Sequence, residues 1–206
     1  MKTYPIMLKV RDRLCVVVGA GPVGLRKARA LAEGGARVAL VGEEVPPADR
    51  TGGMEVIRAR YAPAHLAGAF VVMACTGDRQ VNAAIAADAR AGGALVNVPD
   101  DPDQCDFFVP AVARDGDVVL AVGTGGAAPA LAAGLRQRLA AHLPGRVGEF
   151  PAALGQVRVL VRERAGEAQD RRRILKKLSG EAGYEAFLAG GLEGLLEMAA
   201  SDLEAR

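Results

Sequence analysis

The sequence predicts an α/β fold: an open parallel sheet covered by helices on both faces, followed by a region made of helices. Short apolar runs alternate with helical patterns up to about residue 122, and no strand pattern recurs between Val147 and Arg206. Such alternation is typical of parallel sheets, because a helix must carry the chain back between parallel strands. The chain has 206 residues, of which 50% are hydrophobic, and this is enough for one or two domains with real cores.

The expected sheet has six short strands and two connecting helices. The helices are Val23–Glu33 and Gln80–Ala91. No strand is expected beyond residue 122. Short apolar runs bounded by turn residues indicate strands that are buried on both faces. The six strands are Leu14–Val18, Val38–Val41, Val56–Ile57, Phe70–Ala74, Ala94–Val98 and Val118–Val122.

A leucine-rich helix follows the last strand. It is expected over Pro129–Leu143, with proline in its first turn and Leu143-Pro144-Gly145 ending it. The remaining helices are expected to break near Gly166, Ser179-Gly180 and Gly190-Gly191. The change of pattern predicts three parts, which are a sheet domain over 1–112, a connecting segment over 113–145 and a helical domain over 146–206. The helix carries leucines four residues apart, at Leu131, Leu135, Leu139 and Leu143.

Composition argues against several classes of function. The net charge is +2 and there is no Trp, so neither the electrostatics nor base stacking favours a nucleic-acid partner. No apolar run reaches the roughly 18 residues that span a bilayer, and the N-terminus lacks a signal-peptide pattern, so we expect a cytoplasmic protein without a membrane partner. The three cysteines, Cys15, Cys75 and Cys105, are widely spaced and predict neither a disulfide framework nor a zinc site.

A glycine-rich turn joins the first strand to the first helix. Gly19-Ala20-Gly21-Pro22-Val23-Gly24 matches the dinucleotide-binding pattern G-x-G-x-x-G in the strand–turn–helix context that gives this pattern its meaning. The first glycine permits the tight turn, the second lets the backbone approach a pyrophosphate, and the third allows close packing of the helix. A plain strand–helix turn is the alternative. The candidate cofactor-binding residues are Gly19, Gly21, Pro22, Val23 and Gly24.

Two glutamates follow the second strand and favour NAD over NADP. Glu43 lies 19 positions after Gly24, where an acidic side chain binds the ribose hydroxyls of NAD and repels a 2′-phosphate. Glu44 is next to it, and no Arg stands at that point of the chain. The alternative is that both glutamates are solvated loop residues.

A loop rich in carboxylates follows the strand Ala94–Val98. In open α/β sheets the ligand lies beyond the carboxyl ends of the strands, and Asp100 is the carboxylate nearest to such an end. Asp100 is therefore the candidate general acid or base. Asp101 and Asp103 are equally explained as turn residues. A second glycine segment, Gly123-Thr124-Gly125-Gly126, precedes the leucine-rich helix, where it either approaches a ligand or only connects two elements.

These segments together resemble the precorrin-2 dehydrogenase/sirohydrochlorin ferrochelatase family, the stand-alone form of the N-terminal part of siroheme synthase. The resemblance covers the whole chain and rests on several segments in order. They are Pro5–Leu8 with Val10–Arg13, Val16–Ala36, Ala74–Asn82, Asn97–Ala111, Ala121–Ala132 and Arg171–Leu175.

The resemblance implies a Rossmann-type parallel sheet, a small dimerisation segment over 113–145 and a C-terminal helical domain. It also implies NAD-dependent oxidation of precorrin-2 to sirohydrochlorin, and in many members insertion of Fe²⁺ to give siroheme. Asp100 occupies the position of the family's key aspartate, with roles in proton transfer and metal insertion, and the methyltransferase half of the fused enzyme is expected to be absent. Thr76 and Asn97 are further cofactor-binding candidates.

The resemblance also suggests how the substrate is held. Thr124 stands where some relatives carry a modifiable serine, and the two alanines after Gly126 replace hydroxyl residues that are common there. Precorrin-2 carries many carboxylates, so basic groups are expected along its path. The 171–177 basic run, Arg171, Arg172, Arg173, Lys176 and Lys177, is a weaker candidate because such runs are commonly a solvated helix face. The substrate-binding candidates are Thr124, Gly125, Gly126, Arg114 and Arg136.

Two alternatives to this function remain. One is a dehydrogenase without chelatase activity. The other is a regulatory Rossmann module that senses NAD, although such a module needs neither the Asp100 loop nor the Gly125-Gly126 segment. The leucine stripe of 129–143 is expected to form a homodimer interface, with burial against the chain's own C-terminal helices as the alternative.

Overall fold

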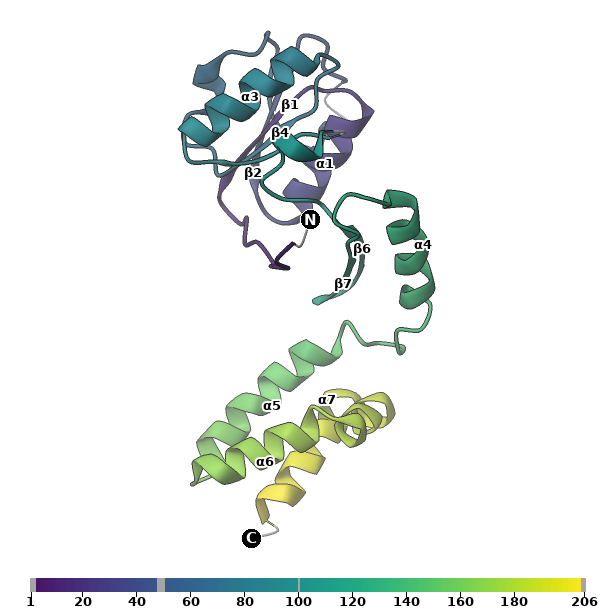
Figure 1. Cartoon of the computed structure of the whole chain (residues 1–206). Helices are drawn as coiled ribbons and strands as arrows, with labels where there is room; N and C mark the ends of the chain where they lie inside the picture. The colour runs from purple at the N-terminus through teal and green to yellow at the C-terminus, as the bar shows by residue number, and fades with distance from the viewer. Residues whose placement is uncertain (1–2, 48–50, 100, 205–206) are drawn as a thin grey trace. The chain divides into compact units, whose positions relative to one another are not determined.

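The computed structural model describes residues 3–47, 51–99 and 101–204. The chain divides into two compact units, Met1–Val109 and Pro110–Arg206, which are described separately (Figure 1). The first contains a parallel sheet and its helices, and the second contains a β-hairpin and four helices of the described residues.

The first unit is built on a five-stranded parallel sheet with the order β3-β2-β1-β4-β5. This confirms the predicted α/β fold with a Rossmann-type sheet. After β3 the chain returns to the other side of β1, so the order reverses between β1 and β4, where open α/β sheets bind their ligands. The strands are β1 (Leu14–Val18), β2 (Arg37–Val41), β3 (Glu55–Ile57), β4 (Val71–Ala74) and β5 (Leu95–Asn97).

Helices cover both faces of this sheet (Figure 1). Along β1, Val16 and Val18 pack in the same buried cluster as Ile85 of helix α3 (Arg79–Ala91). The residues that alternate with them, Cys15 and Val17, pack with helix α1 (Pro22–Glu33). Because successive side chains of a strand point to opposite faces, strands buried on both faces are apolar throughout, which is why their sequence pattern was easy to recognise. Two short 3₁₀ helices, η1 (Pro63–Leu66) and η2 (Pro102–Gln104), complete the unit.

The prediction that Val118–Val122 is a sixth strand of the parallel sheet is wrong. Val118–Val122 forms β7, which pairs antiparallel with β6 (Ala111–Asp115) in a separate two-stranded sheet of the second unit. The two strands are joined by Gly116-Asp117, with Gly116 at a positive φ of 52°. A Gly-Asp pair between two short runs is a hairpin signal, and it also marks β6, which the sequence analysis missed.

Helix α4 (Pro129–Ala140) packs against both strands of this hairpin. It ends three residues before the predicted end at Leu143. Pro144 explains the difference, because a proline ring clashes with the carbonyl four residues earlier, here that of Ala140.

Three helices form the C-terminal core. They are α5 (Phe150–Arg164), α6 (Ala168–Leu178) and α7 (Glu181–Glu204), and α7 is interrupted at Gly191, which has a φ of 61°. The predicted breaks near 166, 179–180 and 190–191 are confirmed. No helix among the described residues is both long and apolar enough to cross a membrane.

We predict that Leu178→Ala destabilises the C-terminal core far more than Leu188→Ala. Leu178 is fully buried, whereas the Leu188 side chain is 45% exposed. Truncation of a buried leucine leaves a cavity and lowers the free energy of unfolding by about 2–5 kcal/mol. Guanidinium unfolding followed by circular dichroism measures the free energy of unfolding of both variants. Equal decreases in this free energy would contradict this description of the core.

Candidate dinucleotide-binding site

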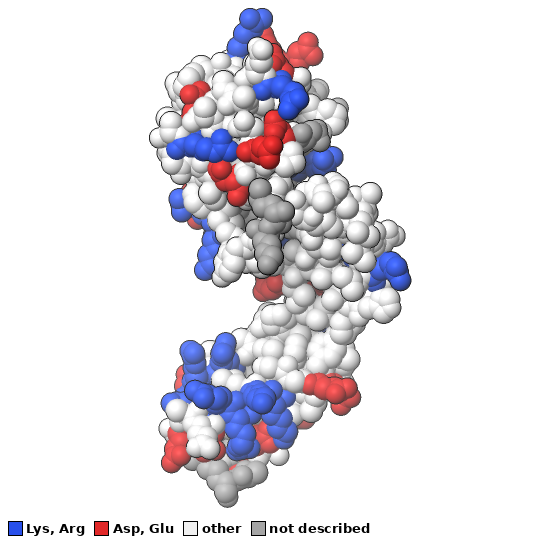
Figure 2. All heavy atoms as spheres, in the orientation of Figure 1, with Lys and Arg blue, Asp and Glu red and all other residues white. Residues whose placement is uncertain are grey.

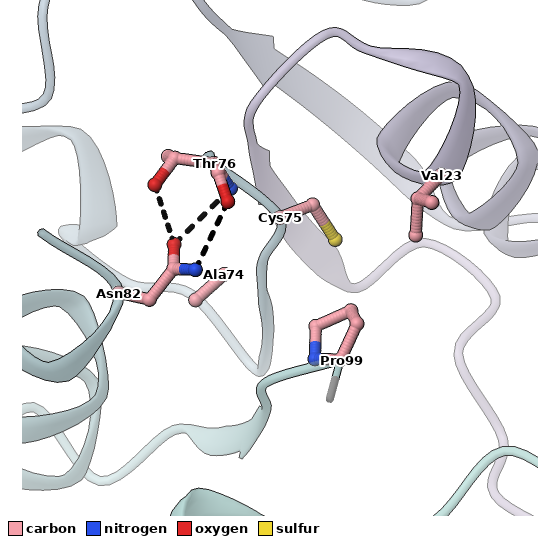
Figure 3. Close-up of a pocket in the computed structure, with 6 residues that line it drawn as sticks. All are labelled: Val23, Ala74, Cys75, Thr76, Asn82 and Pro99. Carbon is pink, nitrogen blue, oxygen red and sulfur yellow. Dashed lines mark hydrogen bonds between the residues drawn. The ribbon is translucent and has the colours of Figure 1, made fainter. Parts of the chain in front are cut away.

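The candidate site lies where the order of the parallel strands reverses. The glycine turn leaves β1 here, and Cys75 and Thr76 leave the neighbouring strand β4. Between them is a small cavity whose lining residues come from α1, α3, β4 and the loops after β4 and β5 (Figure 3). They are Val23, Ala74, Cys75, Thr76, Asn82 and Pro99. Cys75 is only partly buried, and its side chain borders this cavity.

Gly19 and Gly24 are required by the fold itself. Gly19 has a φ of 105°, and a Cβ at this position would overlap the carbonyl group of Cys75 at the end of β4. A Cβ on Gly24 would overlap the carbonyl oxygen of Gly19. These two glycines therefore allow α1 to start directly against the ends of β1 and β4.

Gly21 has no such structural reason to be glycine. A Cβ built on Gly21 would contact nothing within 4 Å. Gly21 is the N-cap of α1, no side chain caps this helix, Pro22 occupies its first turn, and its first turn has no acidic residue. The N–H groups of Val23 and Gly24 have no acceptor within the helix, as at any helix start. The turn thus presents bare backbone and a positive helix end to open space, which suits the pyrophosphate of a dinucleotide.

The loop after β4 is fixed by Asn82, a residue that the sequence analysis did not single out. Asn82 is 7% exposed, and its Oδ1 accepts hydrogen bonds from the backbone N–H and the hydroxyl of Thr76, at 3.1 and 2.7 Å (Figure 3). Its Nδ2 donates to the Thr76 carbonyl. Asp78 caps α3 by accepting from the N–H groups of Gln80 and Val81. Thr76 therefore borders the cavity with a rigid backbone.

Asn97 connects helix α1 to the acidic loop. Its Oδ1 accepts from Lys27 Nζ of α1 at 3.0 Å, and its Nδ2 donates to the Phe107 carbonyl at 2.9 Å. Asn97 is 5% exposed. The side chain is thus engaged within the protein, and a direct contact of Asn97 with the cofactor stays a prediction.

Asp100 lies outside the described residues, but the residues around it are well held. Arg79 Nη2 lies 3.3 Å from a carboxylate oxygen of Asp101, and Arg90 Nε lies 3.0 Å from one of Asp106. The other oxygen of Asp106 accepts from the Val96 N–H. Two of the loop's carboxylates are therefore paired with arginines of α3.

The Cys105 thiol closes the same loop. It donates to the Val98 carbonyl at 3.1 Å, and burial raises its pKa, which keeps the thiol protonated and able to donate.

Among the described residues, no group of three or more His, Cys, Asp or Glu side chains is arranged to hold a metal ion. Asp100 was also predicted to take part in metal insertion. The structure does not describe this residue, so its metal role stays a prediction.

Glu43 has a partner that the sequence analysis did not foresee. Arg60 Nε donates to Glu43 Oε1 at 2.8 Å, so an arginine does stand beside the acidic pair, contrary to the expectation. The two residues are 17 positions apart in sequence, and they meet because β2 and β3 are parallel neighbours whose carboxyl ends adjoin. Glu44 is exposed in the same loop.

The predicted substrate-binding residues all lie in the second unit. Thr124 accepts the Ala128 N–H at 3.1 Å, just before α4, and Gly125 and Gly126 have positive φ values. Arg114 is exposed on β6. The Nε of Arg136 is shielded from solvent and has no hydrogen-bond partner among the described residues. Contacts of these five residues with a substrate stay predictions.

Basic side chains of the second unit gather over α5 and α6 (Figure 2). Two members of the 171–177 basic run have acidic partners, since Arg173 lies 3.6 Å from Asp170 and Lys177 lies 2.6 Å from Asp202. The other three, Arg171, Arg172 and Lys176, remain candidates for substrate carboxylates.

The fold and the glycine turn define a Rossmann-type dinucleotide-binding protein. A family model described as putative NAD(P)-binding matches residues 6–111. The siroheme synthase of Methylobacillus flagellatus is 38% identical over 176 residues, which are 84% of this chain and 38% of that protein. Siroheme synthase 2 of Aeromonas salmonicida is 36% identical over 199 residues, which are 96% of this chain and 40% of that protein. The chain thus spans about two fifths of the length of the curated relatives that it matches.

A solved structure has the same fold. The structure titled "SirC, precorrin-2 dehydrogenase" matches with a TM-score of 0.74 at 20% sequence identity, over 97% of this chain and 100% of that one. The chain belongs to the precorrin-2 dehydrogenase/sirohydrochlorin ferrochelatase family, within the putative NAD(P)-binding proteins of the matching model. The resemblance in the sequence is therefore confirmed.

We predict that Gly21→Ala and Gly24→Ala fail in different ways. The new methyl group at Gly21 meets only open space, so folding is unchanged, but it occupies the position where a pyrophosphate approaches and lowers dinucleotide affinity by about tenfold or more. The methyl group at Gly24 collides with the turn and lowers the melting temperature. Thermal unfolding and calorimetric titration with NAD⁺ distinguish the two, and unchanged affinity in a folded Gly21→Ala protein would remove the phosphate site.

Proposed function

We propose that this chain oxidises precorrin-2 to sirohydrochlorin in the cytoplasm with NAD as the hydride acceptor. The observation that carries the proposal is the uncapped start of α1, where Gly21 leaves bare backbone facing open space at the reversal of strand order. The names of the relatives, siroheme synthase and precorrin-2 dehydrogenase, supply the substrate class.

The proposed placement of the cofactor gives the cofactor and the protein different roles in the reaction. The nicotinamide, when bound, accepts the hydride, and the protein contributes binding and orientation. The turn 19–24 holds the pyrophosphate, the rigid loop at Thr76 borders the adjoining cavity, and Glu43 and Glu44 bind the adenosine ribose. Asp100 takes up the proton that the tetrapyrrole loses as its ring system becomes conjugated.

Iron insertion is the second activity that the family resemblance implies. In that step Fe²⁺ is a substrate, and Asp100 would accept the pyrrole N–H protons as the ion enters the ring. One experiment separates this activity from a dehydrogenase without chelatase activity and from an NAD-sensing module. The protein is incubated with precorrin-2 and NAD⁺, Fe²⁺ is added afterwards, and absorbance spectra follow NADH, sirohydrochlorin and siroheme in turn. A protein that binds NAD⁺ but leaves precorrin-2 unchanged is a sensor.

We predict that Asp100→Ala lowers the rate of sirohydrochlorin formation by about 10²–10⁴-fold, the usual contribution of a general acid or base. Asp103→Ala is the matched control, because it removes a carboxylate from the exposed η2 segment of the same loop. NAD⁺ affinity should be unchanged in both variants. If Asp100→Ala loses only a few-fold in rate, another group takes up the proton.

We also propose a homodimer formed through the dimerisation segment 113–145. On α4 the side chains of Leu131, Leu135 and Leu139 are 56%, 37% and 49% exposed in the single chain, although they form one stripe four residues apart. An apolar stripe of this kind is typical of an interface. A symmetric dimer would bury the same stripe of each chain.

We predict that Leu135→Glu yields a monomer with reduced dehydrogenase activity, because a charge cannot be buried unpaired in an apolar interface. Gln137→Glu places the same charge on an exposed residue of the same helix and should leave the dimer intact. Sedimentation equilibrium at micromolar concentration measures the oligomeric state of both variants. A wild-type monomer with full activity would contradict the dimer proposal.

A further inference from the structure

The carboxyl ends of β2 and β3 carry an acid and a base that face each other. Val41 pairs with Ile57 in the parallel register, and the Gly42 N–H donates to the Ile57 carbonyl at 3.0 Å. Glu43 and Arg60 follow these strand ends within three residues. Their side chains meet at 2.8 Å between Arg60 Nε and Glu43 Oε1.

This pair stands beside the glycine turn. The Gly19 N–H donates to the Val41 carbonyl at 2.8 Å, and a Cβ on Gly42 would lie 3.2 Å from the Cβ of Ala20. The residues after β2 therefore touch the turn that faces the pyrophosphate. In dinucleotide-binding sheets this is the place where an acid binds the adenosine ribose, or where an arginine accepts the 2′-phosphate of NADP.

Arg60 is distinguished from its neighbour Arg58 by its partner. Arg58 Nη1 donates to the carbonyl of Val45, a residue that is 9% exposed, so Arg58 fastens the loop to a buried position. Arg60 instead pairs with the ribose-binding acid itself. Both side chains of this pair are well exposed, at 85% for Arg60 and 61% for Glu43, so the pair is weak and exchanges readily for a ligand.

We propose that Arg60 is a binding residue for the adenosine 2′-phosphate, masked by Glu43, and that the Glu43–Arg60 pair sets the choice between NAD and NADP. The inference rests on the proposed function, because it concerns the cofactor of the same site. With NAD, Glu43 accepts the ribose hydroxyls. With NADP, Arg60 leaves Glu43 and binds the phosphate through charge-assisted hydrogen bonds, for which guanidinium geometry is well suited. The preference for NAD is therefore smaller than a lone glutamate would produce.

The test is calorimetric titration of the whole chain with NAD⁺, NADP⁺ and 2′,5′-ADP, the last of which reports on the adenosine end alone. Arg60→Ala should lower the affinity for NADP⁺ and for 2′,5′-ADP by about tenfold or more, since one charged hydrogen-bonding partner is lost. The affinity for NAD⁺ should stay within about twofold. Glu43→Gln should reverse the preference toward NADP⁺. The double variant should return 2′,5′-ADP to the weak affinity of Arg60→Ala.

Arg37→Ala is the matched control. Arg37 is an exposed arginine at the opposite end of β2, so its removal changes the net charge equally without touching the pair. If Arg60→Ala affects 2′,5′-ADP no more than Arg37→Ala does, the inference is wrong while the proposed function stands. If the wild-type chain binds neither NAD⁺ nor NADP⁺, both the inference and the proposed function are overturned.

Discussion

The close approach of the first βα turn to the end of β4 is the constraint on which the rest of the site depends. Gly19 lies against the carbonyl of Cys75, and Gly24 lies against the carbonyl of Gly19, so neither position has room for a side chain. This contact brings the uncapped start of α1 to the point where strand order reverses. The loop at Thr76, fixed by Asn82, then forms the second wall of the cavity. One packing requirement thus places the uncapped helix end beside this loop.

Much of this arrangement could be predicted from the sequence because its signals are local. The glycine turn and the doubly buried strands are encoded within short stretches. The strand–turn–helix geometry of the turn and the five parallel strands are confirmed. The error at Val118–Val122 arose because an apolar strand pattern does not reveal its partner, and only the Gly116-Asp117 turn indicated a hairpin. The early end of α4 followed from a clash with Pro144, whose effect reaches four residues back. The tetrapyrrole-binding predictions rest on the family resemblance, and they stay predictions.

The Glu43–Arg60 contact shows what a local reading of the sequence misses. The glutamate was recognised from its distance to the glycine turn, whereas Arg60 becomes relevant only once β3 is placed next to β2. The strand order therefore decides the chemistry at the adenosine end of the site. A carboxylate alone would repel a 2′-phosphate, whereas a carboxylate paired with a guanidinium presents both groups to a ribose. The proposed selectivity between NAD and NADP is the difference between these two interactions.

A second connection links the cofactor side of the sheet to the loop that contains Asp100. Lys27 projects from α1 to Asn97 at the end of β5, and Asn97 in turn donates to the Phe107 carbonyl beyond the loop. Cys105 bonds back to Val98 at the loop's start, and Arg79 and Arg90 of α3 hold Asp101 and Asp106. The loop is therefore attached at both ends to the two helices that flank the cavity. A hydride transfer needs its partners in a fixed geometry. In the proposed reaction, attachment to α1 and α3 would hold both ends of the loop at a constant position relative to the cofactor.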